Sequence, residues 1–196
     1  MKIITFYCPK GGVGKSTLSK NFAVFLSLVK QHKVLFLDLD RQRHVMQASE
    51  KHEDWPFIVL DRIPDNFGDV DYVVGDISPV GVAALSVEQK QMLENSDLII
   101  SPFEADSDNI DSMVDIYNLQ TKAIIKPVLN KFTSTSKLHK EALSVIKDCL
   151  VLKSRSAYPQ TSGANSIFFK NPYSSALSNA RNDFKQLANK LLELVK

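Results

Sequence analysis

Residues 10–17 read Lys10-Gly11-Gly12-Val13-Gly14-Lys15-Ser16-Thr17, shortly after an apolar run, Ile3–Tyr7, that is typical of a buried strand. The pattern predicts a strand, a glycine-rich turn and a helix beginning at Ser16. Glycines let backbone N–H groups approach a polyphosphate closely, and a helix N-terminus presents unpaired donors to it. In such a loop Lys15 contacts the β- and γ-phosphates, and the Ser16 hydroxyl binds Mg²⁺. The segment therefore predicts a binding site for a nucleoside triphosphate.

The loop is a variant of the common pattern Gly-x-x-x-x-Gly-Lys-Ser/Thr. That pattern places a glycine where this chain has Pro9. The variant also adds a second lysine, Lys10, at the start of the loop.

Length and composition predict one domain, residues 1–196, in the cytoplasm. Cys8 and Cys149 lie in apolar runs and show no metal-binding spacing, so we expect reduced, buried thiols. No apolar stretch approaches the roughly 18–20 residues of a membrane span. The start, Met1-Lys2 and then a strand, predicts no signal peptide.

The net charge of +2 is unevenly distributed along the chain. Residues 1–116 carry a net charge of −7, whereas residues 117–196 carry +9. Such a basic half favours a surface for a polyanion. The alternative is that acidic groups gather near a metal–nucleotide site while lysines solvate helices elsewhere.

Apolar runs alternate with helical patterns along the whole chain. Most runs are continuous, as in parallel strands covered on both faces. The predicted strands are Ile3–Tyr7, Val34–Leu37, Phe57–Leu60, Tyr72–Val74, Leu98–Ile100, Ala123–Leu129 and Leu150–Leu152. Helical stripes are predicted at Leu18, Phe22, Phe25 or Leu26, and Val29; at Val87–Leu93; at Ile110, Met113, Val114 and Tyr117; at Leu138–Ile146; and at Phe184, Leu187, Ala188, Leu191 and Val195. This alternation predicts an α/β fold with a doubly wound, mainly parallel sheet and helices on both faces.

Aspartates follow two of the predicted strands. Asp38 and Asp40 come after Val34–Leu37, and Asp76 follows Tyr72–Val74. Ligands of such sheets bind at the carboxyl ends of the strands. Carboxylates at this edge are suited to hold Mg²⁺ directly or through water.

Several segments resemble those of the ParA/MinD ATPases. The deviant Walker A, switch I and Walker B segments of that family resemble residues 10–17, Leu37-Asp38-Leu39-Asp40-Arg41-Gln42 and Asp71-Tyr72-Val73-Val74-Gly75-Asp76. Further resemblances are at Asp97–Pro102, at Pro127-Val128-Leu129-Asn130, which matches the base-binding strand, and at Arg155–Phe168 with Gly163. The resemblance implies a P-loop NTPase fold that binds ATP with Mg²⁺.

The resemblance also implies a role for each matching residue. Lys10 would reach the phosphates of the partner in a nucleotide-sandwiched homodimer, and Lys15 and Ser16 would contact phosphate and Mg²⁺ within the chain. Asp40 would position the hydrolytic water. The magnesium shell would include Asp38 and Asp76.

Two positions depart from the family pattern. Arg41 stands where proline usually follows the second aspartate, and Ile77-Ser78 replaces the common threonine–proline. These changes bear on the geometry of the switch and hence on the hydrolysis rate.

The base preference follows partly from the residues themselves. Asn130-Lys131-Phe132-Thr133 begins like the guanine-reading motif Asn-Lys-x-Asp, but Thr133 replaces the aspartate that would bind the guanine N1–H and amine. We therefore expect ATP rather than GTP.

Within this family, the sequence is most similar to the short plasmid partition ATPases. The sequence starts directly on its first predicted strand, so we expect no helix-turn-helix extension like that of the larger ParA proteins, and only about thirty residues separate Asp40 from Tyr72. The expected activity is hydrolysis by an ATP-dependent dimer that binds DNA non-specifically on the nucleoid and is stimulated by a ParB-like centromere-binding adaptor. One alternative is a MinD-like switch that binds membranes through its C-terminal helix, although packing on the sheet explains that helix equally well. Another is a ligase of the dethiobiotin-synthetase type.

Basic residues of the C-terminal part are the candidates for DNA contact. They are Lys137, Lys140, Lys147, Lys153, Arg155, Arg181 and Lys185. Phosphate contacts of this kind predict binding that weakens steeply with salt.

Overall fold

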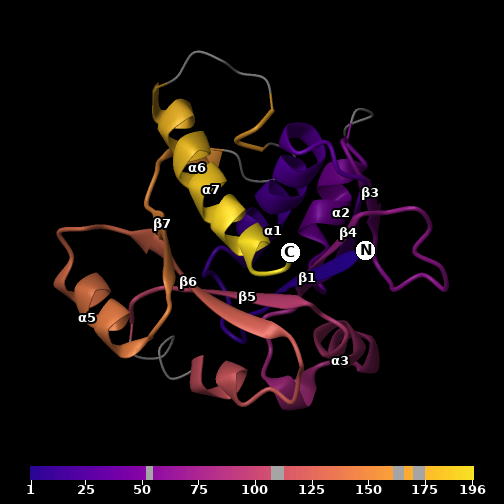
Figure 1. The fold of residues 1–196 in the computed structure, drawn as a ribbon, viewed down its shortest axis with the longest axis horizontal. Coiled ribbons are helices and arrows are strands. Elements are labelled where there is room, and N and C mark those ends of the chain that lie inside the picture. The colour runs from indigo at the N-terminus through magenta and orange to yellow at the C-terminus, as the bar shows by residue number, and fades with distance from the viewer. Residues whose placement is uncertain (52–54, 107–112, 161–165, 170–174) are drawn as a thin grey trace.

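A computed structural model describes residues 1–51, 55–106, 113–160, 166–169 and 175–196. Within these ranges seven strands form one parallel sheet in the order β3-β2-β4-β1-β5-β6-β7 (Figure 1). The strands are β1 (Lys2–Phe6), β2 (Val34–Leu39), β3 (Ile58–Leu60), β4 (Tyr72–Ile77), β5 (Leu98–Phe103), β6 (Ile124–Phe132) and β7 (Leu150–Lys153). Each predicted strand is confirmed, with its ends shifted by a few residues at most.

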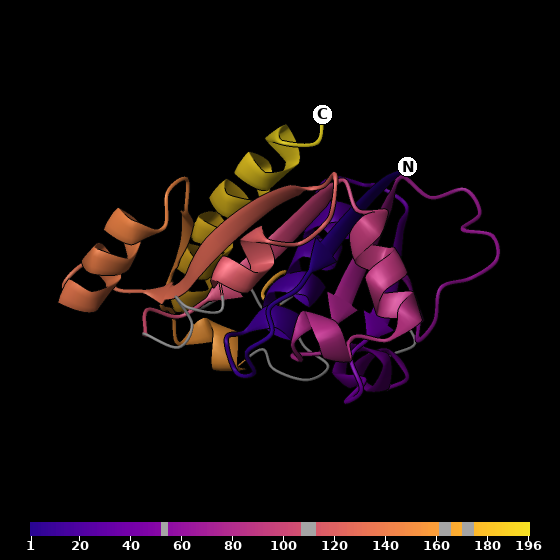
Figure 2. The same ribbon diagram turned by 90° about the horizontal axis from the view of Figure 1, so that it is seen from below.

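Helices cover both faces of the sheet (Figures 1 and 2). One face carries α1 (Lys15–Val24), α2 (His44–Ser49), α6 (Ala157–Gln160) and α7 (Ser175–Glu193). The other carries α3 (Val87–Glu94), a helix at residues 113–117 and α5 (Lys137–Val145), with a short 3₁₀ helix, η2 (Val82–Ala84), before α3. The doubly wound α/β architecture is therefore confirmed.

Strand β2 illustrates why both faces are apolar. Val34 and Phe36 enter the core under α1 and α7, whereas Leu35 and Leu37 enter the core on the opposite face. Because successive side chains of a strand point to opposite faces, a strand buried on both sides reads as a continuous apolar run.

The helix after the phosphate loop differs from its predicted stripe at one end. Beyond Val24 it continues as a π-helix, η1 (Phe25–Val29), which ends with a hydrogen bond from the Lys30 N–H to the Phe25 carbonyl at 3.1 Å. A π-turn holds more residues than an α-turn. The side chains after Val24 therefore point in other directions around the helix axis than the stripe predicted for an α-helix. Phe25 and Leu26 are buried, but Val29 is 39% exposed, and its prediction as a core residue was wrong.

The stripe predicted around residues 110–117 is also shifted. Met113 is buried, as expected, but its partner in the core is Ile116. Val114 is 59% exposed and Tyr117 is 48% exposed, so these two predictions were wrong, and Ile110 lies outside the described residues. In the described part of this helix, Met113 and Ile116, three residues apart, face the core. Residues with this spacing lie on the same side of an α-helix and form a narrow apolar stripe.

Helix α7 buries the apolar positions that the sequence predicted for it, and Val195, two residues beyond its end, is buried as well. Phe184, Leu187, Ala188, Leu191 and Val195 join the core that covers β1, β2 and β7. The apolar face of the C-terminal helix is therefore occupied by the sheet. Among the described residues, no helix combines the length and apolarity needed to cross a membrane.

Candidate nucleotide-binding site

The phosphate loop connects β1 to α1 and is shaped by two glycines in the left-handed backbone region. Gly12 has φ 82° and Gly14, the N-cap of α1, has φ 87°. A Cβ on Gly14 would lie 2.3 Å from Nδ2 of Asn130, which donates a hydrogen bond to the Val13 carbonyl at 2.8 Å. Asn130 at the end of β6 therefore holds the loop against the sheet, and only glycine fits beneath it.

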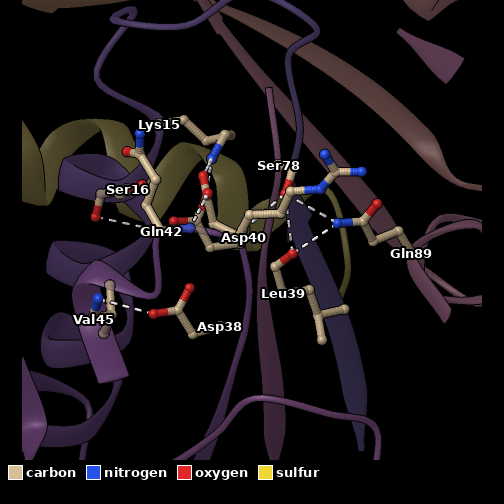
Figure 3. A network of polar contacts seen from close by, with 12 residues as sticks. Lys15, Ser16, Asp38, Leu39, Asp40, Gln42, Val45, Ser78 and Gln89 are labelled. Atoms are coloured by element: carbon tan, nitrogen blue, oxygen red, sulfur yellow. Dashed lines mark hydrogen bonds and ion pairs between the residues drawn. The ribbon is translucent and has the colours of Figure 1, made fainter. Parts of the chain in front are cut away.

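Lys15 lies between two carboxylates at the carboxyl edge of the sheet (Figure 3). Its Nζ is 2.8 Å from Oδ1 of Asp76 and 3.2 Å from Oδ2 of Asp40, and all three side chains are buried. Burial lowers the pKa of Lys15, but attraction to Asp76 and then Asp40 outweighs it and raises the pKa above its ordinary value. The lysine is therefore charged, and its charge is available to a phosphate that displaces these carboxylates.

Asp38 and Asp76 are direct neighbours on strands β2 and β4. Oδ2 of Asp38 accepts hydrogen bonds from the N–H groups of Val45 and Met46 at 2.9 and 2.8 Å, which fixes the start of α2. Burial, and then the negative charges of Asp76 and Asp40, raise the pKa of Asp38 to about 6. The site thus concentrates negative charge where a cation would be stabilised.

Two carboxylate oxygens in this cluster accept no hydrogen bond from the described part of the chain. They are Oδ1 of Asp38 and Oδ2 of Asp76, and both are buried. An unsatisfied buried carboxylate oxygen is unfavourable, and a hydrated Mg²⁺ would satisfy it. Within the described ranges no three acidic, histidine or cysteine side chains form a metal cage. The donor set fits an ion that completes its shell with phosphate oxygens, water and the nearby Ser16 at the start of α1.

Asp40 is held by its side chain and by its loop. Its Oδ1 accepts the Gln42 N–H at 2.9 Å, and its main-chain carbonyl accepts the Arg43 N–H at 3.0 Å. Its other carboxylate oxygen is the one bound to Lys15. A phosphate that drew Lys15 away would free this oxygen to accept a hydrogen bond from water.

A pocket of about 230 Å³ lies beside the phosphate loop. Its walls come from the loop, from α1, from the ends of β6 and β7 and from α6 and α7. The lining residues are Gly12, Gly14, Thr17, Leu18, Asn130, Lys131, Leu152, Lys153, Ser154, Arg155, Tyr158, Pro159 and Phe184. Apolar walls with a few polar groups suit the base and ribose of a nucleotide.

Sequence reasoning found the loop side of this pocket but missed its far wall. Of the predicted nucleotide-binding residues, Gly12, Gly14, Thr17 and Asn130 line it. Leu18 is expected from its spacing only in the core stripe, and Tyr158 lies in the segment Arg155–Phe168 that resembles the family but receives no role from that resemblance. Thr133 is exposed, and its N–H bonds to Nδ1 of His139.

The other loop residues differ in exposure. Val13 is buried, whereas Gly11 is exposed and Lys10 is partly exposed at the start of the loop. The role of Lys10 toward a partner chain stays a prediction. Gly163, part of the late segment that resembles the family, lies outside the described residues.

The candidate DNA-binding residues are not gathered on one surface. Arg155 binds Asp183 through Nη2 at 2.6 Å, Lys153 lies 3.8 Å from the same carboxylate, and Arg181 donates to the carbonyls of Ile167 and Phe169. Their charges serve contacts near α6 and α7, where Lys185 is half-buried. The exposed candidates around α5 are Lys137, Lys140 and Lys147, of which Lys137 lies 3.6 Å from the exposed Glu141 carboxylate on the same helix.

Comparison with known families matches this geometry. The model of the CobQ/CobB/MinD/ParA nucleotide-binding domain matches residues 4–160, which include the phosphate loop, the aspartates and Asn130. The chain belongs to this family. A comparison with curated protein sequences gives no match.

Solved structures of the family share the fold. A Borrelia burgdorferi B31 protein described as a candidate plasmid partition protein, bound to AMPPNP, is 20% identical with a TM-score of 0.69; the match covers 96% of this chain and 99% of that one. McdA of Cyanothece is 15% identical with a TM-score of 0.71, and the match covers 100% of this chain and 100% of that one. The MinD cell division protein of Aquifex aeolicus is 14% identical with a TM-score of 0.69, over 96% of this chain and 98% of that one. At these identities the likeness shows the ParA/MinD fold.

Proposed function

We propose that this single-domain chain is an ATP-dependent partition ATPase. The observation that carries the proposal is the convergence of Lys15, Asp40 and Asp76 at the carboxyl ends of neighbouring strands, beside a base-sized pocket. The fold shared with an AMPPNP-bound protein supports ATP as the nucleotide. Magnesium, when bound, would neutralise phosphate charge, and Ser16, Asp38 and Asp76 are the residues suited to hold it.

The proposed mechanism begins with the exchange of partners at Lys15. The nucleotide phosphates replace Asp40 and Asp76 as the negative charges around Nζ. Asp40 then orients water toward the terminal phosphate, while the backbone N–H groups of the loop stabilise the developing charge. Lys10 contacts the nucleotide of a second copy, so hydrolysis depends on an ATP-bound homodimer.

We further propose that the dimer binds DNA non-specifically on the nucleoid and is stimulated by a ParB-like centromere-binding adaptor. The net charge of +9 on residues 117–196 supports a polyanion as the partner. A neighbour named for plasmid partition is consistent with this role.

A MinD-like membrane switch is the second candidate, since MinD is among the structures with this fold. It requires an apolar face that can enter a lipid surface. The apolar face of α7 packs against the sheet, which favours DNA over membrane as the surface that the protein binds.

Sedimentation with plasmid DNA or with anionic lipid vesicles, each with ATP or ADP, separates these functions. We expect ATP-dependent sedimentation with DNA alone, together with slow ATP hydrolysis. Asp40→Ala should bind ATP and accumulate as a DNA-bound dimer while its turnover falls by at least about 100-fold, because a positioning carboxylate acts in the transition state. Sedimentation with vesicles alone would favour the membrane switch, and turnover of a small acceptor without either partner would favour the ligase.

A further inference from the structure

We propose that Gln89 on α3, acting with Ser78, positions the loop that carries Asp40. The inference rests on the proposed function, because the property that it explains is the placement of the hydrolytic carboxylate. Gln89 is not near the phosphate loop in sequence and belongs to no motif identified above. It is nevertheless buried against the residue that precedes Asp40.

Hydrogen bonds from two side chains tie the loop on both sides of Asp40 (Figure 3). Nε2 of Gln89 donates to the Leu39 carbonyl at 2.7 Å and to Oγ of Ser78 at 3.2 Å. Oγ of Ser78, 3.0 Å away, accepts the main-chain N–H of Arg41. The residues before and after Asp40 are therefore fastened to α3 and to Ser78, the residue that follows β4.

The polar atoms of both side chains are hydrogen-bonded. The Ser78 hydroxyl accepts from Arg41 and Gln89 and lies 3.3 Å from the Leu39 carbonyl, to which it donates. Oε1 of Gln89 accepts the Ser86 N–H at 3.0 Å in the capping box of α3. Because that bond fixes the carbonyl end of the amide, the NH₂ group must face Leu39 and Ser78. Satisfied networks of buried polar groups specify one geometry, which is the requirement for a positioning element.

The two departures from the family pattern meet in this network. A proline at position 41 would have no N–H to donate, and a proline at position 78 would have no hydroxyl to accept it. Arg41 and Ser78 supply the two halves of one hydrogen bond. The network thus explains two residue choices that looked unrelated in the sequence.

The network is needed most when nucleotide is bound. Lys15 holds one carboxylate oxygen of Asp40, and in the proposed mechanism this contact is lost when Lys15 turns to phosphate. The bonds at Leu39 and Arg41 then keep the Asp40 backbone in place. Gln89 is a positioning residue, so its loss should lower kcat for ATP hydrolysis more than it raises KM.

The test compares Gln89→Met, Ser78→Ala and the double variant with Gln91→Met, a control that makes the same substitution at an exposed position of the same helix. We expect kcat to fall by roughly tenfold to 100-fold in each single variant, with KM within about threefold. The double variant should be little worse than the more severe single one, because both side chains act through the same loop. Unchanged kcat in Gln89→Met, or a loss in Gln91→Met of the same size, would overturn the proposal.

Amide hydrogen exchange without nucleotide provides a readout that does not depend on hydrolysis. Protection of the Arg41 amide should be lost in Ser78→Ala, whereas the amides of β1 should keep theirs and show that the fold is intact. Arg41 protection that survives in Ser78→Ala would contradict the network. If the wild-type chain hydrolyses no ATP, the proposed function fails. The exchange of the Arg41 amide then decides by itself whether the hydrogen bond to Ser78 exists.

Discussion

Lys15 has a structural task as well as the task of binding phosphate. It is the cation between the buried carboxylates of Asp40 and Asp76. Lys10, by contrast, is partly exposed at the start of the loop. Replacing Lys15 and replacing Lys10 should therefore impair different properties of the protein.

Lys15→Ala should reduce the affinity for ADP and ATP by roughly 100-fold or more, because a charge-assisted contact to phosphate is lost. It should also lower the free energy of unfolding by about 3–5 kcal/mol, since two buried carboxylates lose their counter-charge. Lys10→Ala should keep monomeric ADP affinity within about threefold and stability within about 0.5 kcal/mol, but it should weaken the ATP dimer. Nucleotide titration, denaturant unfolding and sedimentation velocity measure these effects. An equal loss of ADP affinity in both variants would place Lys10 in the monomer's own site.

At the scale of elements, the sequence was sufficient for the strands and insufficient for the ends of helices. Buried parallel strands have continuous apolar runs, so all seven could be found without knowing their neighbours. The π-helix that exposes Val29 carries no such signal, because the spacing of apolar residues after Val24 is compatible with an ordinary α-helix. The loop could be predicted as glycine-rich, but which glycine is indispensable depends on Asn130, which follows more than a hundred residues later.

Gly12 and Gly14 form a matched pair that tests this dependence on Asn130. Both have positive φ, so alanine at either position should be strained by about 1–2 kcal/mol. Space is open around Gly12, whereas a Cβ on Gly14 collides with Asn130. Gly14→Ala should therefore lower the free energy of unfolding by about 1–2 kcal/mol more than Gly12→Ala, because it also breaks the hydrogen bond from Asn130 to Val13. Urea unfolding measures both variants. Adding Asn130→Ala to Gly14→Ala should be less destabilising than adding it to the wild type; equal effects would show that the collision does not matter.

At the scale of the whole molecule, net charge could be read from the sequence, but the availability of each charge could not. Asp183 neutralises Arg155 from 28 positions away, and Arg181 is directed to main-chain carbonyls. Such pairings depend on how α7 lies against β7 and α6. Predicting a basic half was therefore possible, whereas predicting a basic surface required the fold.

The last prediction concerns which lysines bind DNA. Lys137 and Lys140 are exposed on α5, near the β6 and β7 end of the sheet (Figure 1). Lys137→Glu combined with Lys140→Glu should weaken ATP-dependent DNA binding by roughly tenfold or more, and each lost phosphate contact should reduce the slope of log K against log salt by about 1. The matched control is Lys51→Glu combined with Lys90→Glu, which changes the net charge equally at exposed positions in the acidic part of the chain. Titration of a DNA duplex at several salt concentrations measures both pairs. If the control pair weakens binding as much as the α5 pair, net charge alone governs DNA binding and α5 is not its surface.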